Sequence, residues 1–179
     1  VDLISERFGY YHAGIFLLDE AGEYAVLRAA SSAGGERMLS MQHKLRAGKE
    51  GIVGHVAGSG DSRIALDVGA DAVFFDNPDL PRTRSEIALP LKVYDDVIGV
   101  LDVQSTKEAA FSEEDVGVLQ TMADQLALAI ENARLLEEAD ARVREIRLLL
   151  REESREGWRR LIQRRPGWAY GYDGVDVLP

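Results

Sequence analysis

The 179-residue chain contains no cysteine, few prolines and no long hydrophobic run. Without thiols it can form no disulfide, no thiolate metal site and no cysteine nucleophile, and no chromophore can attach through a thioether. No apolar stretch reaches the roughly 18 residues that a membrane-spanning helix needs. We therefore expect a cytoplasmic protein with no membrane contact in this segment, no metal site and no covalent chromophore, and the residues name no other cofactor.

Positive charge is also scarce, since 21 basic and 31 acidic side chains give a net charge of −10. Nucleic-acid binding depends on a basic surface that contacts phosphates, so we expect no nucleic-acid partner. Hydrophobic residues make up 46% and charged residues 29% of the chain, which indicates a globular protein rather than a disordered one. The chain begins without methionine, and we interpret it as part of a longer protein.

Hydrophobic periodicity predicts several antiparallel strands between two helices. Helices are expected over 2–8 and from about 112 to 155, with a short helix near 51–58. Strands are expected where branched and aromatic residues cluster or alternate: 10–19, 24–30, 62–68, 84–94 and 97–105. Pro90 cannot donate to a sheet ladder and is expected at an edge or a bulge. This order predicts an α+β fold with helices on the faces of an antiparallel sheet.

The last predicted helix carries two apolar stripes. Ser112 and Asp115 form a capping-box pattern at its start, and the stripe over 116–133 is expected to pack on the sheet. A helix to residue 155 would be about 65 Å long at ~1.5 Å per residue, so its second half is expected to project and to pair in a homodimer. The candidate dimer residues are Leu136, Ala139, Val143, Ile146 and Leu150. Alternatively, this second stripe folds back against 158–170.

Five segments in this order carry a family resemblance: HAGIFLLD (12–19), GIVGHVA (51–57), SEIALPL (85–91), IGVLDVQ (98–104) and FSEEDVGVLQTMADQLALAIENARL (111–135). Together they resemble a GAF domain of the kind found in large bacterial multi-domain sensor histidine kinases. The resemblance covers roughly residues 1–136. It implies a profilin-like antiparallel sheet of about six strands, with the N- and C-terminal helices on one face and short helices and loops over a pocket on the other.

We therefore divide the chain into three parts: a GAF-like sensor domain over 1–136, a projecting signalling or coiled-coil helix over 137–156, and a linker or the start of a following unit over 157–179.

The sequence contains no recognisable set of catalytic residues. The glycines of 51–60 match neither GxxxxGK[ST] nor GxGxxG. Some GAF-like proteins reduce methionine sulfoxide with cysteines, which this chain lacks. We expect the segment itself not to be an enzyme, although its parent protein is expected to be a histidine kinase or another signalling enzyme.

The segment 63–86 is the most suggestive of a small-molecule site, because it places aromatic side chains beside a few polar groups. The resemblance to GAF domains implies that this segment covers the pocket as a lid. The candidate ligand-binding residues are Asp67, Asp71, Phe74, Phe75, Asn77, Arg84 and Glu86, with Gln104 on the returning strand. In the alternative interpretation, Phe74 and Phe75 plug the pocket. For Asp102 and Gln104 we favour a structural role, in hydrogen bonds to the covering loops.

These observations predict a sensory, ligand-binding regulatory module that relays a signal through its C-terminal helix to an output domain of a bacterial two-component signalling protein. A possible small-molecule ligand and a second copy of the chain are its expected partners. The alternative is a ligand-free dimerisation and spacer module with a plugged pocket.

Overall fold

The computed structural model describes residues 1–73, 75–164, 171–172 and 177–178. The chain divides into two units, Val1–Glu131 and Asn132–Pro179. The first unit contains a six-stranded sheet in the order β3-β2-β1-β6-β5-β4, in which neighbouring strands are antiparallel. The strands are β1 His12–Leu18, β2 Tyr24–Ala30, β3 Lys44–Arg46, β4 Arg63–Ala65, β5 Ser85–Val93 and β6 Asp96–Ser105. This architecture confirms the predicted α+β fold.

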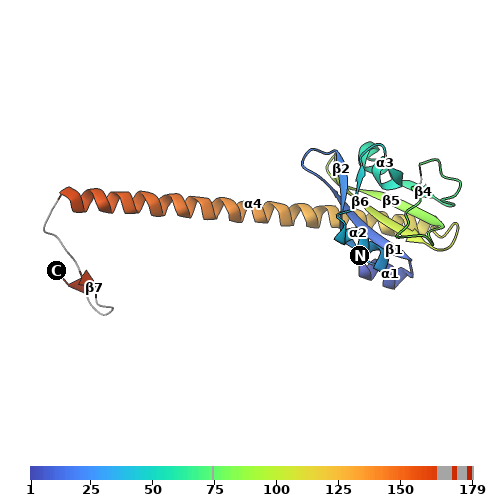
Figure 1. Ribbon diagram of the computed structural model, residues 1–179, viewed down its shortest axis with the longest axis horizontal. Coiled ribbons are helices and arrows are strands. Elements are labelled where there is room, and N and C mark those ends of the chain that lie inside the picture. Colours follow the sequence, from blue (N-terminus) through green and yellow to red (C-terminus); the bar gives the residue numbers. More distant parts are fainter. Residues whose placement is uncertain (74, 165–170, 173–176, 179) are drawn as a thin grey trace. The chain divides into compact units, whose positions relative to one another are not determined.

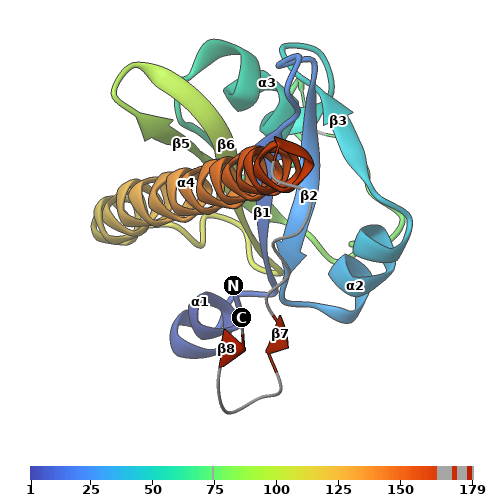
Figure 2. The ribbon, with the colours of Figure 1, turned by 90° about the vertical axis from the view of Figure 1, so that its left-hand side faces the viewer.

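The helices of the first unit cover both faces of the sheet (Figure 1). On one face lie α1 (Asp2–Phe8) and the first part of α4 (Glu113–Arg164); on the other lie α2 (Ala33–Ser40) and α3 (Gly51–Ser59). Each face has its own buried core, because successive side chains of a strand point to opposite faces. Figure 2 shows β3 beside β2 at one edge of the sheet.

Strand β6 illustrates how alternation separates the two cores. Val100 is fully buried in the core beneath α2 and α3, whereas Leu101 and Val103 are fully buried in the core beneath α1 and α4. Pro90 lies within β5, where β4 has already ended, so its missing N–H breaks no ladder on that side. A register shift between Leu91 and Lys92 follows directly, as expected for a bulge near this proline.

Two elements were missing from the sequence prediction. The strand β3 has only three residues, too few for a recognisable alternation. Helix α2 contains Gly34 and Gly35, which normally disfavour a helix. Both glycines lie in crowded positions: a Cβ on Gly34 would lie 2.1 Å from the carbonyl oxygen of Asp79.

The capping box at the start of α4 is confirmed. The Ser112 N–H donates to Asp115 Oδ2 at 2.9 Å, and the Asp115 N–H donates to Ser112 Oγ at 3.2 Å. The helix ends at Arg164 rather than near 155, because a single helical glycine such as Gly157 costs only about 1 kcal/mol.

In the second unit, residues 132–164 belong to this continuous helix. The fold-back alternative is therefore wrong for 158–164, since residues of one unbroken helix cannot pack antiparallel against each other; residues 165–170 lie outside the described residues. The short strands β7 (Gly171–Tyr172) and β8 (Val177–Leu178) pair with each other. Among the described residues, no helix combines the length and apolar character that crossing a membrane requires.

Candidate functional site

A small cavity lies between the sheet and the elements that cover it, with a volume of about 30 Å³. It has room for about one water molecule. The strands contribute its floor, and α2, α3 and the segment after β4 contribute its walls. The lining residues are Phe16, Met38, His43, Leu45, Gly51, Ile52, Val53, Phe75, Asn77, Glu86, Asp102 and Gln104.

Two buried carboxyl groups dominate this cavity. Glu86 on β5 is 5% exposed and Asp102 on β6 is 1% exposed, and both side chains line the cavity. Gln104 Nε2 donates to Asp102 Oδ2 at 2.8 Å, and Thr83 Oγ1 donates to Gln104 Oε1 at 2.6 Å. These two consecutive hydrogen bonds, from Thr83 to Gln104 and from Gln104 to Asp102, fix the orientation of the Asp102 carboxyl group.

Burial governs the protonation of this pair. Burial raises the pKa of Asp102 to about 7, and the hydrogen bonds from Gln104 and Glu86 oppose that rise. Burial, followed by the charge of Asp102, raises the pKa of Glu86 well above its usual range. No lysine or arginine is among the described residues that line the cavity, so the pair holds a proton in place of a counter-cation near neutral pH.

Two buried polar atoms at the cavity lack a hydrogen-bond partner within the described structure: Asp102 Oδ1 and His43 Nε2. Burial lowers the pKa of His43, which keeps the imidazole neutral at pH 7. Buried polar atoms normally have partners, because an unmet hydrogen bond costs about 1–3 kcal/mol. The cavity therefore presents an unused acceptor on Asp102 and a second unused polar atom on His43.

A wider hollow adjoins the cavity at the surface. It has a volume of about 470 Å³ and includes Lys44, Lys49 and Glu50 in its lining. The hollow and the cavity share four lining residues, His43, Leu45, Gly51 and Phe75. Phe75 is 48% exposed, which places its side chain at the boundary between the buried cavity and the open hollow.

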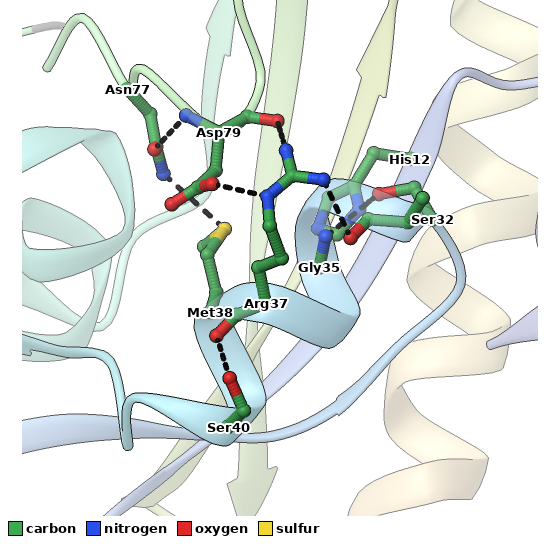
Figure 3. A network of polar contacts seen from close by, with 9 residues as sticks. His12, Ser32, Gly35, Arg37, Met38, Ser40, Asn77 and Asp79 are labelled. Atoms are coloured by element: carbon green, nitrogen blue, oxygen red, sulfur yellow. Dashed lines mark hydrogen bonds and ion pairs between the residues drawn. The ribbon is translucent and has the colours of Figure 1, made fainter.

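The segment 77–80 is fastened to α2 by polar contacts, which Figure 3 shows at close range. Arg37 Nε donates to Asp79 Oδ1 at 2.8 Å, and Asn77 Nδ2 donates to Met38 Sδ at 3.4 Å. The Asp79 N–H donates to Asn77 Oδ1 at 2.9 Å and fixes the local turn. Asn77 and Met38 both line the cavity, so these contacts hold part of its wall.

The structure brings together half of the residues predicted as a ligand site. Four of them line the cavity: Phe75, Asn77, Glu86 and Gln104. Arg84 and Asp67 are exposed and do not line the cavity. Arg84 is exposed between two buried neighbours, Thr83 and Ser85. Asp67 accepts a hydrogen bond from the Gly69 N–H. Asp71 forms an ion pair with Arg63 at 3.0 Å instead. Phe74 lies outside the described residues.

The sequence analysis gave Asp102 a structural role and left His43 without one. The signal for Asp102 was an acid between the apolar residues Leu101 and Val103 of a strand, where a buried charge needs a special reason. His43 follows α2, and nothing in its neighbourhood in the sequence marks it. His12 on β1 is fully buried, and its Nδ1 atom forms a hydrogen bond of 2.8 Å with Ser32 Oγ. Burial lowers the pKa of His12 to about 4. Within the described residues, no group of three or more metal-ligating side chains occurs.

The antiparallel sheet has α1 and α4 on one face and a cavity covered by α2 and α3 on the other, which defines the class of the fold as an α+β domain. A family model described as the GAF domain matches residues 1–131, and the chain belongs to this family. GAF domains are generally ligand-binding regulatory modules. No curated protein matches the chain.

Solved structures support the same assignment. The GAF domain of a phosphoenolpyruvate-protein phosphotransferase from Acinetobacter is 25% identical, with a TM-score of 0.65 over 77% of this chain and 81% of that chain. The free methionine-R-sulfoxide reductase of Neisseria meningitidis, solved with its substrate, is 28% identical, with a TM-score of 0.63 over 74% of each chain. The type II enzyme of Thermoplasma acidophilum is 24% identical, with a TM-score of 0.61 over 72% of this chain and 85% of that chain. None of these three is a histidine kinase, so that context stays a prediction.

The expectation that the segment is not an enzyme is wrong, because similar structures include two free methionine-R-sulfoxide reductases. That expectation rested on the absence of a recognisable catalytic motif in the sequence, which included the missing cysteines. The missing thiols exclude only thiol chemistry by this chain's own residues. A buried carboxyl pair with raised pKa values is itself the kind of group that transfers protons in enzymes.

Proposed function

We propose that the first unit binds a small ammonium-bearing molecule between Glu86 and Asp102. The observation that carries the proposal is the buried carboxyl pair, which faces a cavity without a lysine or arginine among its described lining residues. An ammonium group would supply both the missing positive charge and hydrogen-bond donors for Asp102 Oδ1. The related sulfoxide reductase from Neisseria was solved with its substrate, and free methionine sulfoxide carries such an amine.

Ligand access requires a local opening, because about 30 Å³ holds no more than a water-sized molecule. Displacement of Phe75 would join the cavity to the adjoining hollow of about 470 Å³. The joined space falls within the range of roughly 300–1,000 Å³ found for small-molecule sites. Binding would therefore couple a cation at the carboxyl pair to the position of the segment that carries Phe75 and Asn77.

The signal would pass from β6 to α4 within the first unit. Asp102 and Gln104 face the cavity, and the alternate residues Leu101 and Val103 pack in the same core as Leu119 and Ala123 of α4. A shift of β6 on ligand binding would thus reach α4 through the core that the two elements share. We further propose that α4 pairs with that of a second copy through Leu136, Ala139, Val143, Ile146 and Leu150, and that the pair carries the signal to an output domain.

The small volume of the cavity favours a second candidate function, a spacer module that binds no ligand. A screen by thermal unfolding and calorimetry separates the two candidates. Amines and amino acids, methionine sulfoxide included, are tested against the chain and its Glu86→Gln and Asp102→Asn variants, with the exposed Asp67→Asn as control. Binding that only the two buried variants abolish supports the proposal, and no binding by any compound supports the spacer. Chromatography of each incubated compound detects turnover.

A further inference from the structure

The cavity beneath α2 and α3 limits the size of its occupant as long as it stays closed. Its volume of about 30 Å³ leaves room for a particle of the size of a water molecule. A larger amine reaches the buried carboxyl pair only after Phe75 has moved. The closed cavity therefore suits an occupant no larger than a water molecule.

The unused polar atoms of the cavity call for a hydrogen-bond donor. Asp102 is 1% exposed, and its Oδ1 atom has no partner within the described structure. Neither lining amide reaches this atom, since Gln104 Nε2 donates to Asp102 Oδ2 and Asn77 Nδ2 donates to Met38 Sδ. A small occupant that donates to Asp102 Oδ1 would satisfy it.

His43 adds a second unpartnered atom to the same wall. Its Nε2 atom has no partner within the described residues, and burial lowers the pKa of the imidazole, which keeps it neutral at pH 7. A neutral imidazole has one acceptor nitrogen. Together with the carboxyl oxygens of Asp102 and Glu86, the cavity thus offers acceptors from several directions around one small space.

The charges around the cavity favour a cation. The charged groups that act on Glu86 and His43 from neighbouring segments are acidic: Asp71, Asp79 and Glu50. Helices α2 and α3 contribute apolar side chains to the lining, and the lysines Lys44 and Lys49 belong to the adjoining hollow instead. A neutral water molecule would leave the charge of an ionised carboxyl group uncompensated, whereas a cation would balance it.

The set of acceptors favours ammonium over a metal ion. Hard metal ions such as calcium take about six or more oxygen ligands. Within the part of the chain that the structure describes, no group of three or more histidine, aspartate or glutamate side chains could hold a metal ion. An ammonium ion is of similar size to water and needs only a few acceptors, because it binds through directed N–H bonds.

We propose that the closed cavity binds a free ammonium ion between Asp102 and Glu86, so that the first unit responds to ammonium itself. The site is that of the proposed function, on which this proposal rests, and the ammonium ion is the ligand of its closed state. Larger amines compete for the same carboxyl pair and differ from ammonium in requiring Phe75 to move. Above pH 7 the charges balance, because Asp102 is ionised while Glu86, whose pKa burial raises well above its usual range, keeps its proton.

Thermal unfolding of the full 179-residue chain tests the proposal, with chloride salts of ammonium, potassium, sodium and tetramethylammonium compared at pH 8 and one ionic strength. Ammonium at about ten times its Kd should raise the Tm by roughly 3–6 °C relative to sodium. Potassium has no N–H donors and tetramethylammonium is too large for the closed cavity, so both should match sodium. At pH 5 the shift should vanish, because Asp102 is then protonated.

A pair of variants and a direct contact locate the ion. Asp102→Asn should abolish the ammonium shift, and the exposed Asp67→Asn should retain it. The first variant is expected to be more stable than the original chain at pH 8, so its loss of the shift cannot come from unfolding. Nuclear Overhauser contacts should join the protons of ¹⁵N-labelled ammonium to the methyl groups of Ile52 and Val53, which line the cavity.

The outcomes separate this proposal from the proposed function. A shift that is equal for all four salts, or that persists in Asp102→Asn, overturns the ammonium site. A larger amine that binds in the screen while ammonium does not also overturns it and leaves the proposed function standing. Binding of ammonium without binding of any larger amine supports the ammonium site and overturns the opening at Phe75.

Discussion

Glu86 and Asp102 bury two carboxyl groups against each other on neighbouring strands, with Gln104 as the hydrogen-bond donor to one of them. The pair is costly for the free protein, because each carboxyl group loses solvation and repels the other when both are ionised. Such an arrangement favours a protonated or cation-bound state. Its consequences for stability and binding can be measured separately.

The first prediction concerns pH. The pKa of Asp102 is raised to about 7, so the folded chain binds more protons than the unfolded chain between about pH 4 and 7. The free energy of unfolding should therefore fall as the pH rises through this window and level off above it. Asp102→Asn removes this loss and should be about 1–3 kcal/mol more stable than the original chain at pH 8.

Urea denaturation at several pH values checks this prediction, with the exposed Asp67→Asn as control. The control should follow the pH profile of the original chain. A profile for Asp102→Asn that is parallel to the original would contradict a raised pKa at this position.

The second prediction uses the glycines of two helices. A Cβ on Gly35 would lie 2.5 Å from the Ala30 Cβ and 2.7 Å from His12 Cε1, so Gly35→Ala should destabilise the first unit by about 1–3 kcal/mol. At Gly117 in α4, a Cβ would meet nothing within 4 Å. Gly117→Ala should therefore stabilise the chain by up to about 1 kcal/mol. Denaturation midpoints of the two variants should move in opposite directions.

The third prediction concerns the fastening of the cavity wall. Asp79→Ala removes the ion pair to Arg37, which is 58% exposed at its side chain, so the global free energy of unfolding should change by less than about 1 kcal/mol. Local opening should increase, because the segment 77–80 loses one of its polar contacts with α2 while the contact between Asn77 and Met38 remains. Native-state hydrogen exchange should show faster exchange at the Leu80 amide. Asp95→Ala, in the exposed β5–β6 turn, should leave that rate unchanged.

The fourth prediction concerns Phe75 as the barrier between cavity and hollow. Phe75→Ala should speed both association and dissociation of the ammonium compound selected by the screen, because the barrier side chain is removed. Stopped-flow binding measures both rates. Tyr94→Ala, which truncates a side chain that is 95% exposed, should alter neither rate. If the Phe75 variant binds at the original rates, another residue limits access.

The sequence predicted the parts of the fold that follow from periodicity. Long alternating strands such as β5 and β6, and a helix start with Ser112 and Asp115, depend on local residue patterns. Helix α2 does not, because Gly34 and Gly35 lie in close contact with Asp79 and His12, which are distant in the sequence. Strand β3 does not, because its three residues are too few to show an alternation.

The same distinction applies to the site. Glu86 was predicted as one of the polar groups beside aromatic residues in the segment 63–86, and Gln104 as a polar residue on a mainly apolar strand. Asp102 contributes through its depth in the sheet, 1% exposed, and through an oxygen without a partner. Neither property can be read from neighbouring residues. Asp67 and Arg84 have suitable side chains on exposed positions, which a sequence pattern cannot distinguish from buried ones.

The short edge strands of the sheet have a further consequence. An exposed edge can recruit a strand from another molecule, but β3 and β4 have only three residues each, and Pro90 lies in β5 just beyond the end of β4. Each edge therefore offers too few backbone groups to template an added strand. The short length of both edge strands, together with the charged side chains of Lys44 and Arg46 on β3, therefore protects the sheet from pairing with a strand of another molecule.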